Sequence, residues 1–126
     1  MAFRVGDILH VTGLPIYPAK GKFCVLIQIA PNRFFLINTE NRKEYDCIPL
    51  SKKGRNFPKH DSFIGCKNIF HAEDSQVDSK VGKINNEELS ALATKVRDSK
   101  FIAKIQKDPI LKAIEMEFKN RKKEAP

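Results

Sequence analysis

The sequence predicts a mainly-β fold, a small barrel followed by two or three helices. Over residues 1–70, short apolar runs alternate with turns rich in Gly, Pro and Asn, a pattern typical of compact barrels of about five strands. After residue 85, apolar residues recur at spacings of three and four, which is the period of an α-helix. The 126 residues suffice for one domain with its own core. We therefore expect a single domain over 1–126, with the barrel at about 4–71 and the helices at about 85–122.

The first three strands are predicted from apolar runs that turn residues separate. Gly6 opens a strand over residues 7–11, and a loop with two Pro and two Gly follows it. The near-continuous apolar run 23–29 suits a central strand of the sheet. After a turn at 31–33, residues 34–38 run back along it, as in a hairpin.

Two further strands are predicted over residues 45–50 and 62–70. Between them lies the basic, Gly-containing segment 51–56, and Pro58 keeps the approach to the last strand irregular. Residues 72–80 are polar and acidic, so we expect them to form a loop between the barrel and the helices.

The helices are predicted from caps and apolar stripes. Asn85, followed by two acidic residues, is typical of a helix start because it satisfies free N–H groups and the helix dipole. An apolar stripe at helical spacing then runs from Leu89 to Val96. A second short helix is expected to start at Asp98 or Ser99. A third is expected at Asp108-Pro109, with Pro at the first helical position.

The chain is basic, with a net charge of +8. The excess lies in residues 1–70 and 100–126, whereas 71–99 is slightly acidic. A basic barrel favours polyanionic partners such as RNA or DNA, although a basic domain without a nucleic-acid partner has the same composition.

The cysteines and the hydropathy of the chain indicate the cellular compartment of the protein. The three Cys, at 24, 47 and 66, lie in apolar surroundings and form no CxxC pair, which fits buried free thiols in a reducing cytoplasm. No apolar run marks a signal peptide or approaches the roughly 18 residues of a membrane span. We therefore expect a cytoplasmic protein without a membrane anchor.

Four short motifs resemble, in their order along the chain, the PemK/MazF family of toxin endoribonucleases. Gly6-Asp7-Ile8 is similar to the first strand of that family, and residues 22–27 are similar to its Val-rich strand with a preceding basic residue. Residues 61–66 resemble a later strand, and residues 81–89 resemble the turn that precedes a helix. The resemblance covers about residues 4–96.

The resemblance implies an SH3-like barrel, a homodimer, and metal-independent cleavage of single-stranded RNA that a cognate antitoxin inhibits. One position departs from the family, because its usual Arg-Pro before the Val-rich strand is Lys22-Phe23 here. Lysine keeps the positive charge but lacks the planar fork with which arginine holds a phosphate.

Metal-free RNA cleavage needs a base for the 2′-OH, stabilisation of the phosphorane charge, and an acid for the leaving 5′-oxygen. His60 is the candidate acid or base, and Asp61 is the candidate to orient it or to act as the base. Lys22 is the candidate for phosphate binding. The family places a Ser or Thr at the end of a later strand, and Thr39 or Ser51 matches it as a donor to a phosphate oxygen.

The remaining candidates are cations for the RNA backbone, namely Lys20, Lys52, Lys53 and Arg55. No metal site and no cofactor are expected, because the His and Cys residues show no paired ligand spacing.

Two function classes stay open at this point. The first is a toxin-like endoribonuclease, which His60-Asp61 favours. The second is a non-catalytic SH3-like barrel that binds nucleic acid or an acidic partner protein, which Lys22 in place of arginine favours.

Overall fold

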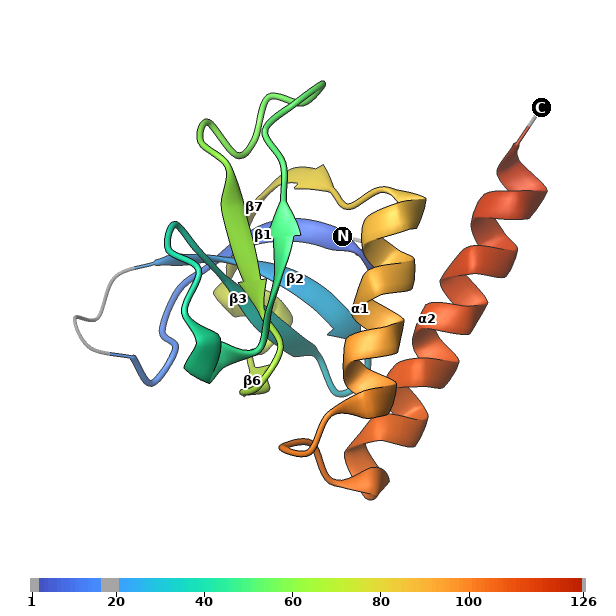
Figure 1. The fold of residues 1–126 in the computed structure, drawn as a ribbon. Helices are drawn as coiled ribbons and strands as arrows, with labels where there is room; N and C mark the ends of the chain where they lie inside the picture. The colour runs from blue at the N-terminus through green and yellow to red at the C-terminus, as the bar shows by residue number, and fades with distance from the viewer. Residues whose placement is uncertain (1–2, 17–20, 126) are drawn as a thin grey trace.

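The structure, a computed structural model, describes residues 3–16 and 21–125. It is an antiparallel barrel-like sheet with two helices packed along one side, α1 between the sheet and α2 (Figure 1). This confirms the predicted fold class. The strands are β1 (Asp7–Val11), β2 (Lys22–Gln28), β3 (Arg33–Asn38), β4 (Cys47–Leu50), β5 (Ser62–Gly65), β6 (Phe70–His71) and β7 (Val77–Lys83). The helices are α1 (Asn86–Asp98) and α2 (Lys104–Glu124), and two short 3-10 turns are η1 (Lys43–Tyr45) and η2 (Asp74–Gln76).

The strand order is β4-β5-β3-β2-β1-β7, with β6 paired to β3. The predicted strand over 62–70 is therefore two strands. β5 pairs with one end of β3, and β6 pairs with the other end, where Phe34 lies opposite Phe70. The chain leaves the ladder between them because the Cys66 and Lys67 N–H groups bond to the Tyr45 carbonyl, at 2.9 and 3.1 Å.

The expectation of a loop over 72–80 is wrong for its second half. β7 begins at Val77 and pairs with the whole length of β1. Sequence pattern misses it because most of its side chains are exposed, so it lacks the apolar alternation of a half-buried strand. A polar edge strand of this kind is a common way to discourage edge-to-edge association.

The motifs at 6–8 and 81–84 turn out to be partners across the β1–β7 ladder, with Ile8 opposite Gly82. Asp7 is buried, accepts the Arg4 N–H at 2.8 Å, and pairs with Lys80 at 3.1 Å. Gly6 has a φ of +92°, a conformation that glycine adopts without strain. These motifs therefore join β7 to β1 at one edge of the sheet.

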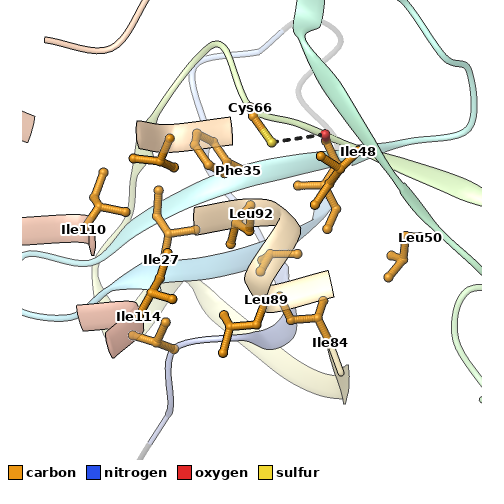
Figure 2. Packing of buried hydrophobic residues seen from close by; sticks show 14 of the residues in the cluster. Ile27, Phe35, Ile48, Leu50, Cys66, Ile84, Leu89, Leu92, Ile110 and Ile114 are labelled. Atoms are coloured by element: carbon orange, nitrogen blue, oxygen red, sulfur yellow. Dashed lines mark hydrogen bonds between the residues drawn. The ribbon is translucent and has the colours of Figure 1, made fainter. Parts of the chain in front are cut away.

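The core consists of two clusters on opposite faces of the sheet. Val25 and Ile27 of β2 point into the larger cluster, and Cys24 and Leu26 point into the smaller one. Burial on both faces explains the continuous apolar run of this central strand. The larger cluster also receives the inner faces of both helices, and Figure 2 shows its side chains meeting there, Leu89 and Leu92 from α1 and Ile110 and Ile114 from α2 among them.

The helix α1 begins as predicted. The Asn85 side chain accepts the Glu88 N–H, and the Glu88 carboxylate accepts the Asn85 N–H, both at 2.8 Å. Such a capping box satisfies two N–H groups at the helix start.

The predicted second and third helices are one helix, α2, and its predicted starts are wrong. Ser99 is the C-cap of α1, where its N–H donates to the Val96 carbonyl at 3.3 Å, and its hydroxyl accepts the N–H groups of Phe101 and Ile102 in the segment between the helices. α2 begins at Lys104, and Pro109 lies inside it. Neither helix, within the part of the chain that the structure describes, is long and apolar enough to cross a membrane.

Candidate functional site

A groove of about 740 Å³ lies beside β3. Its lining includes Lys22 at the start of β2 and Leu36 of β3. Asn38, Thr39, Glu40, Arg42 and Tyr45, at the end of β3 and in the segment that follows, also line it, as does Lys67 after β5. Pro15 and Ile16 complete this part of the lining.

The charge of the groove lining is predominantly positive. Lys22, Arg42 and Lys67 contribute three cations, and Glu40 contributes one carboxylate. An open cleft lined by cations attracts anions and raises their local concentration. The groove is therefore suited to a phosphodiester chain.

Arg42 lines the groove and contacts two neighbouring side chains. Its Nη2 lies 3.1 Å from a carboxylate oxygen of Glu40, and its guanidinium carbon lies 5.9 Å from the ring centre of Tyr45. The hydrogen bond to Glu40 raises the pKa of Arg42, so this side chain is a permanent cation. A guanidinium over an aromatic face is also stabilised by the cation–π interaction.

The segment that bears Tyr45 is joined to the helix α1 by a salt bridge. Asp46, which follows Tyr45, has a φ of +52° and receives a 2.8 Å salt bridge from Lys95 of α1. This hydrogen bond raises the pKa of Lys95. The contact joins the groove to the first helix.

The groove brings together two of the residues that the sequence nominated, Lys22 and Thr39. Lys22 begins β2, opposite Val11 of β1, and Thr39 follows the last residue of β3. The two positions are remote in sequence, and the hairpin of β2 and β3 brings them to the same groove. Lys20, a nominated RNA contact, lies outside the described residues.

The nominated residues His60, Asp61 and Ser51 do not line the groove. They belong to the loop 51–61 that joins β4 to β5, drawn in green in Figure 1. Because β4 and β5 pair over four residues, this loop and η1 lie at opposite ends of their hairpin, separated by about 10 Å of strand.

These three residues form hydrogen bonds that stabilise the loop. Asp61 accepts the Lys52 N–H at 3.0 Å, and Ser51 accepts the Lys53 N–H at 3.1 Å. The His60 carbonyl accepts the Ser62 hydroxyl at 2.9 Å. Their roles in catalysis stay predictions.

The nominated cations of this loop differ in their surroundings. Lys52 and Lys53 are exposed. Arg55 is half-buried and donates to both carboxylate oxygens of Glu88, at 2.7 and 2.9 Å. Its guanidinium therefore fixes the loop to the start of α1, and its contact with RNA stays a prediction.

Sequence reasoning missed four side chains that line the groove, Glu40, Arg42, Tyr45 and Lys67. The first two lie in what reads as an ordinary polar turn, and Lys67 lies inside a predicted strand. Only the tertiary fold, through the bonds from Cys66 and Lys67 to Tyr45, brings them into the same groove as Lys22.

Comparison with known proteins rests on structure. No family model matches the chain, and no curated protein matches its sequence. A solved structure of the Mycobacterium tuberculosis toxin MazF-mt6 is similar, with a TM-score of 0.55 and 15% sequence identity over 69% of this chain and 89% of the toxin. This chain has the fold of a MazF-type toxin.

A second solved structure supports the same assignment. It is an endoribonuclease in complex with its cognate antitoxin from a mycobacterial species, with a TM-score of 0.58 and 14% identity over 77% of this chain and 97% of that one. The MazF-like fold thus spans nearly the whole length of both neighbours. In the described residues, no group of three or more His, Cys, Asp and Glu side chains is arranged to hold a metal ion.

Proposed function

We propose that this protein is a toxin endoribonuclease that cleaves single-stranded RNA in the groove beside β3 without a metal ion. The proposal rests on one observation above all, that Lys22 and Thr39 line the same cationic groove. These are the two positions at which the resemblance to the PemK/MazF family implies a phosphate-binding cation and a hydroxyl donor. The MazF-like fold of the chain supports the proposal.

In this proposal the groove acts on the phosphodiester through charge and hydrogen bonds. The Lys22 ammonium neutralises the charge that develops on the phosphorane, and the Thr39 hydroxyl donates to a non-bridging oxygen. Lys67 adds a further cation to the lining of the groove. Lys52 and Lys53, at the far end of the β4–β5 hairpin, contact the RNA backbone outside the groove.

The proposed partners follow from the same likeness. One structural neighbour is an endoribonuclease bound to its cognate antitoxin, which supports an antitoxin as the inhibitor of this protein. The homodimer and the cytoplasmic location are proposed from the family resemblance and the free thiols.

The proposed function is tested by incubating the pure protein with a long single-stranded RNA, with and without EDTA. We expect cleavage that EDTA leaves unchanged and that produces fragments ending in 2′,3′-cyclic phosphate and 5′-OH. A Thr39→Ala variant should lose activity while keeping its thermal stability, since Thr39 is exposed. Intact RNA after prolonged incubation at high protein concentration would contradict the proposal.

The non-catalytic reading has one specific observation in its favour, the lysine at position 22 where the family has arginine. In that case the protein binds RNA without cutting it. Charge reversal of Lys52 and Lys53 should then still weaken binding, more at low salt than at high salt.

A further inference from the structure

Two chemical requirements of metal-free RNA cleavage are unmet by Lys22 and Thr39. A base must take the proton of the 2′-OH, and neither an ammonium nor a hydroxyl is a good proton acceptor at neutral pH. The phosphorane is bound most tightly by a planar donor that forms two parallel hydrogen bonds, which a lysine does not supply. The residues for both tasks must be sought elsewhere in the groove.

The described lining of the groove contains one carboxylate, Glu40, and one guanidinium, Arg42. They are paired, with Arg42 Nε and Nη2 at 3.2 and 3.1 Å from Glu40 Oε2. Glu40 directly follows Thr39, so the carboxylate and the hydroxyl donor enter the groove from adjacent positions of one segment. The Tyr45 ring supports the guanidinium from the other side.

The pair is not needed to hold the fold together. The side chains of Glu40 and Arg42 are 69% and 50% exposed, and Glu44, the other acidic neighbour of Arg42, is 4.0 Å away. An exposed ion pair contributes about 0–1 kcal/mol to stability. Both side chains can therefore give up their mutual pairing and contact groups of a bound RNA instead.

We infer that Glu40 is the proton acceptor of the reaction and that Arg42 is the residue that holds the scissile phosphate with two hydrogen bonds. This inference rests on the proposed function and assigns to Glu40 and Arg42 the roles predicted from sequence motifs for His60 and Lys22. Arg42 thus supplies, from the segment that follows β3, the guanidinium that the chain lacks at position 22.

The chemical step balances with groups of the groove alone. Glu40 takes the proton from the 2′-OH, and the 2′-oxygen forms a bond to phosphorus while the bond from phosphorus to the 5′-oxygen breaks. The 5′-oxygen takes a proton from the Lys22 ammonium. The products are a 2′,3′-cyclic phosphate and a 5′-OH, and exchange with water returns Glu40 and Lys22 to their charged forms.

The test compares initial cleavage rates of the wild-type protein and the variants Glu40→Gln, Arg42→Ala and Arg42→Lys. Loss of the base should lower the rate about 100-fold to 10,000-fold. Loss of the guanidinium should lower it about 100-fold, and Arg42→Lys should recover only part of that loss because it restores charge without the fork.

A matched control is the Arg97–Asp98 pair on α1, which has a 3.0 Å contact and side chains 66% and 64% exposed, outside the groove. The variants Arg97→Ala and Asp98→Asn should leave the cleavage rate within about two-fold of the wild type. Thermal unfolding of all variants should give similar midpoints, which separates loss of chemistry from loss of fold.

Binding of an uncleavable RNA with 2′-O-methyl groups gives an independent reading. Arg42→Ala should weaken this binding, and Glu40→Gln should preserve or strengthen it because it removes a negative charge. If the wild type cleaves RNA and the Glu40→Gln and Arg42→Ala variants cleave it equally fast, the inference is overturned and the proposed function stands. Absence of cleavage by the wild type would overturn the proposed function and the role of Glu40 together, and unchanged binding by Arg42→Ala would overturn the role of Arg42.

Discussion

Arg55 donates two hydrogen bonds to the carboxylate of Glu88 and so joins the basic loop after β4 to the first turn of α1. Both side chains are mostly buried, with 17% and 11% exposed. Glu88 at the same time accepts the Asn85 N–H in the capping box. One carboxylate thus fixes both the start of the helix and the base of the loop.

Replacing Arg55 by Ala should therefore destabilise the protein, because it leaves the Glu88 carboxylate without its main partner. We expect a loss of about 2–3 kcal/mol in the free energy of unfolding, measured with urea. The exposed neighbour Lys53 is the control, and Lys53→Ala should change the free energy by less than about 0.5 kcal/mol. Equal stability of the two variants would show that the Arg55 pair is not structural.

Glu117 of α2 should be the most stability-sensitive charge of the C-terminal helix. Its side chain is 6% exposed, and it receives hydrogen bonds from Arg4, at 3.0 and 3.1 Å, and from Arg121, at 2.7 Å. Glu117→Ala should cost about 3 kcal/mol, since it removes the buried carboxylate that two guanidinium groups share. Glu115→Ala on the same helix breaks only the exposed pair with Lys119, so chemical unfolding should detect little change.

The pair of Arg4 and Glu124 should make stability depend on pH. The hydrogen bond from Arg4 lowers the pKa of Glu124 below its ordinary value of 4.5. A lowered pKa in the folded state means that the pair stabilises the fold above about pH 4.5 and that this contribution disappears as the carboxylate is protonated below that value. Glu124→Gln should lower the unfolding midpoint at pH 7, and its difference from the wild type should shrink as the pH falls through the lowered pKa of Glu124. A constant difference across this range would argue against the pair.

The three thiols should differ sharply in reactivity. Burial raises the pKa of both Cys24 and Cys66 to about 12, so almost no thiolate is present near neutral pH. Cys47 is half-buried at the start of β4. Titration of the folded protein with a thiol reagent should therefore modify one cysteine rapidly and the other two only after unfolding. The Cys47→Ser variant should show no rapid phase, and a persisting rapid phase would mean that a buried thiol is accessible.

The sequence predicts the parts of this fold that local chemistry determines. Apolar runs located β1 to β5, and Asn85 located the start of α1. It missed β7, because a strand whose side chains are mostly exposed shows no apolar alternation. It divided α2 into two helices, because a Pro is also typical of the first position of a helix.

The candidate site was only partly predictable for a related reason. Lys22 and Thr39 were recognised from motif positions, and both line the groove. Arg42 and Glu40 carry no local signal, because their place in the groove depends on how the turn after β3 packs against the chain leaving β5. His60 and Asp61 form a motif in sequence, but the β4–β5 hairpin places them away from this groove.

The central claim, that RNA is cleaved in the groove beside β3, is tested most directly by comparing cleavage rates of Lys22→Ala and His60→Ala on one RNA. Removing the charge that stabilises the phosphorane and protonates the leaving 5′-oxygen should lower the rate of Lys22→Ala about 100-fold or more, and Lys22→Arg should recover only part of that loss because a guanidinium does not release its proton. His60→Ala should stay within a few-fold of the wild type. A large loss in His60→Ala together with full activity in Lys22→Ala would move the active site to the loop 51–61 and contradict the account.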